Sequence, residues 1–384
     1  MKVCYFGTYS RQEGYPMNRV IIEGLRKNNV EVIECHSNLW KDREKIEGKF
    51  NLFSIPVFIL RLLYTYVCLI RKFFKIESYD ILIVGYIGHF DIFLARFLNM
   101  FKGKRPIIFN ALFSLYETIV IDRRFIPTNS LRGRLLWVID KYSCYMADRV
   151  ILDTNEHIYY FIKEFGLARD KFIKILVGSE QFSVTNPDGR IKKKPYTNDL
   201  FNIIFFGTYI PLHGIEYIVK AAKAVEEHED IQFILIGSGQ IYREIEELAS
   251  NLDTKNILFI NHWIGYEGLA RYIEEADICL GIFGKSEKTD RVIPCKVFDC
   301  LSMAKPVITG RTRAIQELLK DRESVLLSEM ADHKTLADAI LTLKNDEALR
   351  EKIAANGYQV YKENASREII GRELARYLNT LIKE

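Results

Sequence analysis

Two copies of one short pattern constrain the fold of this chain more than any other feature. Tyr5-Phe6-Gly7-Thr8-Tyr9 ends an apolar run near the N-terminus, and Phe205-Phe206-Gly207-Thr208-Tyr209 ends a similar run in the second half. In both copies a strand runs into a glycine turn. We therefore predict two similar nucleotide-type domains, each opened by such a strand.

Strands alternate with helical segments throughout both halves, which predicts an α/β fold made of two doubly wound parallel sheets. Ligands of such sheets bind at the carboxyl ends of the strands. The predicted strands of the first half are residues 2–7, 31–35, 80–86, 106–112, 148–154 and 171–178. Those of the second half are residues 202–207, 231–237, 256–260, 277–283, 306–310 and 324–327.

The length of 384 residues also favours two domains, because a single apolar core rarely serves so long a chain. A stretch without periodicity, rich in Asn, Pro, Gly and Lys, separates the two runs of strands and reads as a linker. The predicted boundaries are residues 1–180 for the first domain, 181–200 for the linker, 201–365 for the second domain, and 366–384 for a final helix.

Composition narrows the possible partners and compartment. The net charge of +4 is too small to argue for nucleic acid, and no nucleic-acid-binding motif is present. Seven scattered cysteines without a CxxC pair favour reduced thiols inside a cell. The N-terminus reads as a first strand with no room for a signal peptide. We expect a cytoplasmic protein.

The most hydrophobic window, residues 50–76, is rich in aromatic side chains and is interrupted by Arg61. Its apolar runs are shorter than the roughly 18 to 20 residues that a membrane span requires. Two interpretations remain: a long helix packed on the sheet, or a cationic helix that lies on an anionic membrane surface. The second predicts weak, salt-sensitive contact with a membrane through residues 52–76.

Residues 290–310 read as a charged loop, a helix and a buried strand, and they form the strongest candidate site. Lys296 and Asp299 fall on one face of the helix, which suits a ligand that carries phosphate and a hydroxylated sugar. An amphipathic surface helix is the alternative. Glycine turns after two strands strengthen the ligand interpretation, since glycine lets the backbone approach a phosphate. The turn residues assigned to the ligand are Gly14, Gly207, Thr208, His213, Gly237 and Gly239. For His213, a capping or solvent-exposed role is the alternative.

Candidate residues of the first half follow two of its predicted strands. His89 follows the third strand, and Tyr116, Glu117, Asp122 and Arg123 lie in an expected loop after Leu112. We expect them to face the cleft between the domains, with Glu117 or Asp122 as a possible general base. No cluster has metal-ligand spacing and no Ser-His-Asp set or GxSxG elbow is present, so neither a metal nor a cofactor is expected.

The second half of the chain resembles the group 1 glycosyl transferases, which are retaining nucleotide-sugar enzymes of family 4 with the GT-B fold. The resemblance rests on FFGTYIPLHGIEYIVKAA, QFILIGSGQ, IEEADICLG and IPCKVFDCLSMAKPVITG, and more loosely on DRVILDTNEHIYYFIKEFG in the first half. It implies two Rossmann-like domains facing across a cleft, a nucleotide diphosphate sugar on the second domain and an acceptor on the first. It also implies a last helix that returns to the first domain.

The resemblance assigns roles to individual residues. Asp299 occupies the place of the second glutamate of the family's E-x7-E motif, which holds the ribose, and Arg291 occupies the place of the first. Thr208 and His213 stand where the family has the arginine and lysine of its phosphate site. We expect Arg291 and Lys296 to replace that charge, Ile293 and Cys295 to line the donor, and His89 to lie near the sugar. The donor base, the sugar, the acceptor and the oligomeric state leave no trace in the sequence.

Three functions follow from these assignments. The first is a hexosyltransferase that acts on a saccharide or lipid-linked saccharide in surface polysaccharide or glycolipid assembly, in the cytoplasm or at the inner face of the cell membrane. The second is a nucleotide-sugar 2-epimerase on the same fold. The third is a catalytically silent GT-B subunit that binds a partner transferase, because three of the four polar landmarks of the family site have changed.

Overall fold

The computed structural model describes residues 1–11, 16–39, 55–179 and 200–383. The chain divides into two compact units, residues 1–177 with 367–384, and residues 178–366. Gly14 and the predicted linker up to residue 199 lie outside the described residues. Each unit has its own apolar core of buried strand and helix side chains.

The first unit contains a six-stranded parallel sheet in the order β2-β1-β3-β4-β5-β6. Its central strands are apolar and buried along their whole length, as expected for a sheet that helices cover on both faces. The strands are β1 (Lys2–Gly7), β2 (Glu31–His36), β3 (Ile81–Val84), β4 (Ile107–Asn110), β5 (Arg149–Leu152) and β6 (Phe172–Lys174).

The second unit repeats this plan with the sheet order β12-β11-β10-β7-β8-β9, again parallel throughout. Its strands are β7 (Phe201–Phe206), β8 (Ile231–Ile236), β9 (Ile257–Ile260), β10 (Ile278–Leu280), β11 (Val307–Gly310) and β12 (Leu326–Ser328). The predicted fold class, two Rossmann-like doubly wound sheets, is confirmed. Several strands are shorter than predicted, because the last residues of those runs leave the ladder to form loops.

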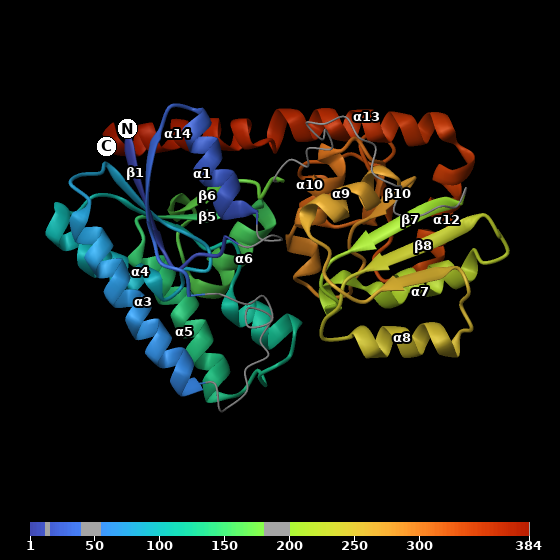
Figure 1. Cartoon of the computed structure of the whole chain (residues 1–384), viewed down its shortest axis with the longest axis horizontal. Helices are drawn as coiled ribbons and strands as arrows, with labels where there is room; N and C mark the ends of the chain where they lie inside the picture. The colour runs from blue at the N-terminus through green and yellow to red at the C-terminus, as the bar shows by residue number, and fades with distance from the viewer. Residues whose placement is uncertain (12–15, 40–54, 180–199, 384) are drawn as a thin grey trace. The chain divides into compact units, whose positions relative to one another are not determined.

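Helices cover the faces of both sheets (Figure 1). In the first unit they are α1 (Met17–Lys27), α3 (Ile55–Lys75), α4 (Asp91–Asn99), α5 (Leu131–Met146), α6 (Asn155–Phe165) and α14 (Arg367–Lys383), with short turns η2 (Met100–Lys102), η3 (Glu117–Asp122) and η4 (Arg169–Lys171). In the second unit they are α7 (Ile215–Ala224), α8 (Tyr242–Asn251), α9 (Tyr266–Glu274), α10 (Cys295–Ser302), α11 (Arg313–Gln316), α12 (His333–Asn345) and α13 (Glu347–Asn364), with η5 (Pro211–His213) and η6 (Thr289–Arg291). None of the described helices is both long and apolar enough to span a bilayer.

The expected loop after Leu112 is wrong, because residues 117–122 form the helical turn η3. No proline or glycine interrupts this stretch, and side chains satisfy the free N–H groups at its start. Asp140 accepts hydrogen bonds from the backbone N–H groups of Leu115 and Tyr116, and Ser114 Oγ accepts from that of Glu117.

The final helix α14 belongs to the first unit and packs along α1 (Figure 1). Two glycines make the approach possible: a Cβ atom on Gly24 would lie 2.4 Å from Arg367 O, and one on Gly371 would lie 2.0 Å from Gly24 C. Arg149 adds a hydrogen bond of 2.9 Å to the hydroxyl of Tyr377.

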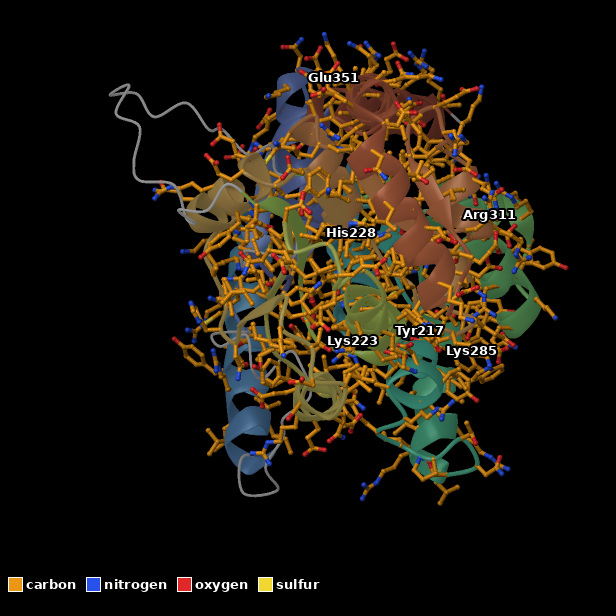
Figure 2. All side chains as sticks on the ribbon, turned by 90° about the vertical axis from the view of Figure 1, so that its right-hand side faces the viewer. Tyr217, Lys223, His228, Lys285, Arg311 and Glu351 are labelled. Carbon is orange, nitrogen blue, oxygen red and sulfur yellow. The ribbon has the colours of Figure 1, made fainter. Side chains whose placement is uncertain are left out.

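Figure 2 labels several charged side chains of the second unit, among them Lys223, Lys285, Arg311 and Glu351. Arg311, labelled there, directly follows β11 and donates to Asp321 at 2.6 Å and to Glu329 at 2.8 Å. Because Glu329 directly follows β12, these bonds brace the carboxyl ends of two neighbouring strands.

Candidate donor site and buried polar network

The sheet order of the second unit places its candidate site at a change of direction. β7 lies between β8 and β10. The connection after β7 leads to β8 in one direction along the sheet, and the connection after β10 leads to β11 in the other direction. In open parallel sheets, ligands bind beside the carboxyl ends of the strands at such a point. The Gly207 turn follows β7, and the segment that leads into α10 follows β10.

Two of the predicted glycine turns lie in direct contact at this edge. Gly207 and Gly237 have φ values of +137° and +129°, in the region that favours glycine. A Cβ atom on Gly237 would lie 2.1 Å from Gly207 O. Behind them, Tyr209 N donates to Ser238 O at 3.0 Å, and a Cβ atom on Gly239 would lie 2.7 Å from Tyr209 N. The backbones are therefore held close together, as the sequence predicted.

Lys296, in the first turn of α10, reaches back to the Gly207 turn. A Cβ atom on Gly207 would lie 3.1 Å from Lys296 Nζ, and this nitrogen lies 3.7 Å from the centre of the Phe205 ring. Lys296 is buried, and its ammonium has no hydrogen-bond partner among the described residues. Burial holds the pKa of Lys296 well below its usual range.

A buried ammonium without hydrogen-bond acceptors is costly, because it has lost its water and gained little in exchange. An anion at the glycine turns would supply the missing acceptors, and the positive dipole end of α10 would add to the attraction. The arrangement is therefore suited to a phosphate or diphosphate group.

His213 fixes the loop that follows Gly207. It is buried, not solvent-exposed, and its Nδ1 lies 2.5 Å from Thr208 O, so Nδ1 carries the proton and donates. Its ring packs against Phe205 at a centroid distance of 5.6 Å. Thr208 contributes its backbone carbonyl to this bond, so both residues shape the wall behind Lys296.

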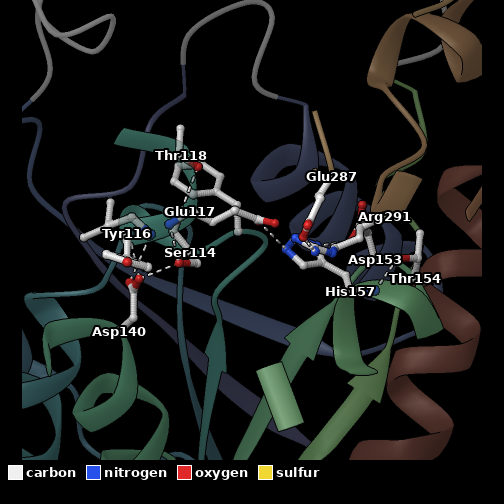
Figure 3. Close-up of polar contacts among 12 residues, drawn as sticks. Ser114, Tyr116, Glu117, Thr118, Asp140, Asp153, Thr154, His157, Glu287 and Arg291 are labelled. Atoms are coloured by element: carbon white, nitrogen blue, oxygen red, sulfur yellow. Dashed lines mark hydrogen bonds and ion pairs between the residues drawn. The ribbon is translucent and has the colours of Figure 1, made fainter. Parts of the chain in front are cut away.

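The other predicted donor residues surround the start of α10. Asp299 is buried and accepts a hydrogen bond of 2.6 Å from Ser179 Oγ. Arg291 pairs with Glu287 at 2.5 Å within one helical turn, and Figure 3 draws this pair. Ile293 is buried and Cys295 is partly buried. Arg291 therefore has a carboxylate partner of its own, whereas Lys296 lacks one.

In the first unit, the turn that corresponds to the Gly207 turn has a carboxylate beside it, where the second unit has a lysine. Asp91, at the start of α4 after β3, accepts from Thr8 N at 2.6 Å and from Thr8 Oγ1 at 3.0 Å. A Cβ atom on Gly7 would lie 2.6 Å from Asp91 Oδ2. β3 neighbours β1 as β10 neighbours β7, so Asp91 and Lys296 occupy corresponding positions. A carboxylate of the chain itself already fills the first turn.

His89 is buried in the first unit. Its Nε2 lies 3.1 Å from Phe113 O and 3.5 Å from Asp140 Oδ1. Burial lowers the pKa of His89 to about 4, so the ring is neutral at pH 7, with the proton on the nitrogen that donates to Phe113. Asp140 also accepts from Ser114 Oγ at 2.6 Å, and burial raises its pKa to about 7.

A second histidine, His157, was missed by the sequence reasoning and joins the same network (Figure 3). It is buried on α6, with Nδ1 2.8 Å from Asp153 Oδ1 and Nε2 3.5 Å from Glu117 Oε2. Burial opposes a charge on this ring, but the two carboxylates outweigh it and raise the pKa of His157 to about 9. At pH 7 the group is a buried imidazolium between two acidic side chains.

The remaining predicted residues of the first unit belong to η3 and its ends. Asp122 is buried, whereas Tyr116 and Arg123 are partly exposed. Within the described ranges, no group of three or more His, Cys, Asp or Glu side chains is arranged to hold a metal ion. The network therefore consists of hydrogen bonds and ion pairs among protein groups.

Known proteins that resemble this chain are glycosyltransferases. The family model described as Glycosyl transferases group 1 matches residues 201–346. An uncharacterized glycosyltransferase of Methanocaldococcus jannaschii is 27% identical over 226 residues, which cover 56% of this chain and 62% of the relative. A capsular polysaccharide biosynthesis glycosyltransferase of Staphylococcus aureus is 24% identical over 76% of this chain and 81% of its own length.

Solved structures with little sequence identity share the whole fold. HepE of Anabaena, solved in complex with UDP, has a TM-score of 0.70 at 14% identity and covers 99% of this chain and 100% of its own. The glycine turns and Lys296 lie within the segment that the family model matches. Residues 201–346 therefore match the family model described as Glycosyl transferases group 1, within a two-domain fold of the GT-B type.

Proposed function

We propose that this protein is a retaining glycosyltransferase that transfers a hexose from a nucleotide diphosphate sugar to a saccharide or lipid-linked saccharide. The observation that carries the proposal is the buried Lys296 ammonium beside the Gly207 and Gly237 turns, which lacks an acceptor within the described chain. The similarity to HepE, which was solved with UDP, supports a nucleoside diphosphate as the matching ligand.

The donor would lie with its diphosphate against the two glycine turns. Lys296 contributes a positive charge, the N-terminal end of α10 contributes its dipole, and the glycines let the phosphates approach the backbone. Asp299, one helical turn further along α10, is the proposed ribose ligand, so Ser179 would share this carboxylate with the sugar hydroxyls. Ile293 and Cys295 complete the donor side, and Arg291 is the proposed second cation after it exchanges Glu287 for phosphate.

The chemistry required of these residues is charge stabilisation. The bond between the sugar's anomeric carbon and the diphosphate oxygen breaks, a bond from an acceptor hydroxyl forms on the same face, and the hydroxyl proton passes to the departing diphosphate oxygen. Negative charge grows on the diphosphate, where Lys296 stabilises it most in the transition state. The acceptor residues proposed on the first unit are His89, Tyr116, Glu117, Asp122 and Arg123.

The proposed acceptor class is supported by the name of a relative. The Staphylococcus aureus relative is named for capsular polysaccharide biosynthesis, which supports a saccharide acceptor in surface polysaccharide assembly. A lipid-linked saccharide is the form in which such an acceptor would be presented at a membrane. No metal enters the proposed reaction, since Lys296 and backbone groups supply the positive potential.

Two measurements test this function in order. Thermal unfolding against a panel of nucleotide sugars and nucleoside diphosphates identifies the donor base, with a gain of about 2.7 kcal/mol expected at 100 times the dissociation constant. The matching nucleotide sugar is then incubated with saccharide acceptors, and NMR reads the anomeric configuration of the product. Lys296→Ala should lower turnover strongly, while Lys305→Ala, which removes a lysine bonded to Ala276 O, should not.

The same assays separate the two other functions considered for this fold. A 2-epimerase would convert the nucleotide sugar into its epimer without an acceptor. A silent subunit would bind the nucleotide yet neither hydrolyse nor transfer the sugar. Transfer with inversion of the anomeric configuration would refute the retaining mechanism alone.

A further inference from the structure

Helix α3 of the first unit carries two apolar stripes, only one of which packs on its own domain. Leu69 and Phe73 are fully buried and contact the first core. A second stripe recurs at spacings of three, four and finally seven residues and stays exposed. Its members are Val57, Leu60, Tyr64, Val67 and Phe74, with exposed fractions of 66%, 68%, 72%, 45% and 51%. A helix that is apolar on both sides needs a second apolar neighbour.

The exposed stripe continues onto the next helical segment. The ring of Phe74 lies 6.3 Å from that of Phe101 in η2, which lies 5.4 Å from that of Phe97 in α4. Phe97, Met100 and Phe101 are all more than half exposed. We call the α3 stripe and these three residues the apolar face. Soluble monomers rarely expose continuous apolar patches of more than a few hundred Å².

The charges on and after helix α3 are mostly positive. Helix α3 carries Arg61, Arg71, Lys72 and Lys75 and no Asp or Glu from its first to its last residue. Further cations follow in Lys102, Lys104 and Arg105. Most carboxylates of the neighbouring segments are buried in the domain, namely Asp91, Glu117, Asp122 and Asp140, while Glu77 stays exposed.

We propose that the apolar face docks on the surface of a bilayer that contains anionic lipids. Aromatic and aliphatic side chains would enter the headgroup boundary, while Arg and Lys contact the anionic headgroups. A second protein copy is the less suitable occupant, because two faces with cationic surroundings repel each other. The inference concerns the first unit and does not depend on the Lys296 site.

The test is flotation of the full-length protein with vesicles of phosphatidylcholine, with and without phosphatidylglycerol. We expect binding only to the anionic vesicles, with loss at high salt. Arg71→Gln with Lys75→Gln should weaken partitioning about fivefold for each charge removed. Tyr64→Ser with Val67→Ser, and separately Phe97→Ser with Phe101→Ser, should each weaken it by about tenfold or more.

Matched controls come from exposed apolar residues elsewhere on the first unit. Ile382→Ser and Tyr159→Ser replace side chains that are 42% and 61% exposed, and both variants should float like the wild type. All variants should keep the thermal shift with nucleoside diphosphate, which shows that they are folded. If this shift is absent in the wild type as well, the proposed function fails and the flotation result still stands.

Three results would overturn the proposal. The first is equal partitioning onto neutral and anionic vesicles. The second is an equal loss of binding in the controls. The third is a stable dimer in light scattering that Phe97→Ser with Phe101→Ser dissociates, without vesicle binding by the wild type, since the apolar face would then be covered by a second copy.

Discussion

Replacing Lys296 by methionine should leave the free protein as stable as before, or more stable, while it removes most of the ligand response. Methionine keeps the length and apolar contacts of the lysine stem but not the charge. Apolar replacements of buried ionic groups are often neutral, or stabilising by about 1 to 4 kcal/mol. Here the ammonium has no acceptor among the described residues, so the replacement should fall at the stabilising end.

The pH dependence of this effect follows from the lowered pKa of Lys296, which burial causes. Between that lowered pKa and the usual value of about 10.4, the unfolded chain binds more protons than the folded one. The stability of the wild type should therefore rise with pH across this window, and Lys296→Met should remove that contribution. The stabilisation by methionine should be largest at the acid end of the window.

The ligand response can be estimated in the same way. A nucleoside diphosphate at 100 times its dissociation constant stabilises the wild type by about 2.7 kcal/mol, or about 5 to 10 °C for a unit of this size. Loss of a charge-assisted bond worth about 1.5 to 3 kcal/mol weakens binding roughly 10- to 100-fold. At the same concentration, the variant should then gain only about 0.4 to 1.4 kcal/mol.

Differential scanning fluorimetry, with and without the nucleoside diphosphate that shifts the wild type, measures both quantities, and inorganic pyrophosphate tests the diphosphate part alone. Lys305→Met is the control, because Lys305 already donates to Ala276 O at 3.1 Å. A full thermal shift in Lys296→Met would refute the diphosphate assignment. A large loss of stability in the free variant would refute the claim that the ammonium lacks a partner.

Three further changes probe the surroundings of the sites. Gly237→Ala should lower the unfolding free energy by about 2 kcal/mol or more, because its Cβ would lie 2.1 Å from Gly207 O. Gly103→Ala is the control, with φ of +86° and open space around it, and should cost about 1 kcal/mol. Urea titrations compare the two variants. The stabilisation from His157 should be complete below about pH 6.5 and disappear as pH rises through about 9, since its folded pKa is raised above its unfolded value. In urea titrations at several pH values, His157→Gln should flatten that slope and cost about 3 to 5 kcal/mol below pH 6.5, and an unchanged slope would contradict the assignment. Asp91→Asn should destabilise the first unit by about 1 to 3 kcal/mol in chemical unfolding, without altering the thermal shift with nucleoside diphosphate.

Local patterns in the sequence were sufficient to predict the sheets and the two glycine turns. Each strand is a short apolar run with its own boundary signals, and the Gly207 and Gly237 turns follow two adjacent strands. The position of Lys296 in the first turn of a helix was predictable for the same reason. The helical turn at residues 117–122 was not, because Asp140, which caps its start, is distant in sequence.

Contacts between distant segments explain the residues that the sequence did not reveal. His157 acquires its charge from Asp153, four residues before it, and from Glu117, which lies on another element. Asp153 directly precedes Thr154, the N-cap of α6, so its contact with His157 in the first turn is local, but nothing local indicates Glu117. Burial of His213 likewise depends on the surrounding Phe205 and Thr208, not on the residues adjacent to it.

The repeated glycine turn shows why an internal repeat predicts a fold better than it predicts a site. Gly7 and Gly207 end equivalent strands and are followed by the same two residues, so a phosphate site was conceivable at either turn. What separates them is one side chain at the start of the helix after the adjacent strand, Asp91 in one unit and Lys296 in the other. The carboxylate already accepts from Thr8 and would repel an anion, whereas the ammonium has no hydrogen-bond acceptor in the described part of the chain and would attract one. The anion site is therefore expected in the second unit alone.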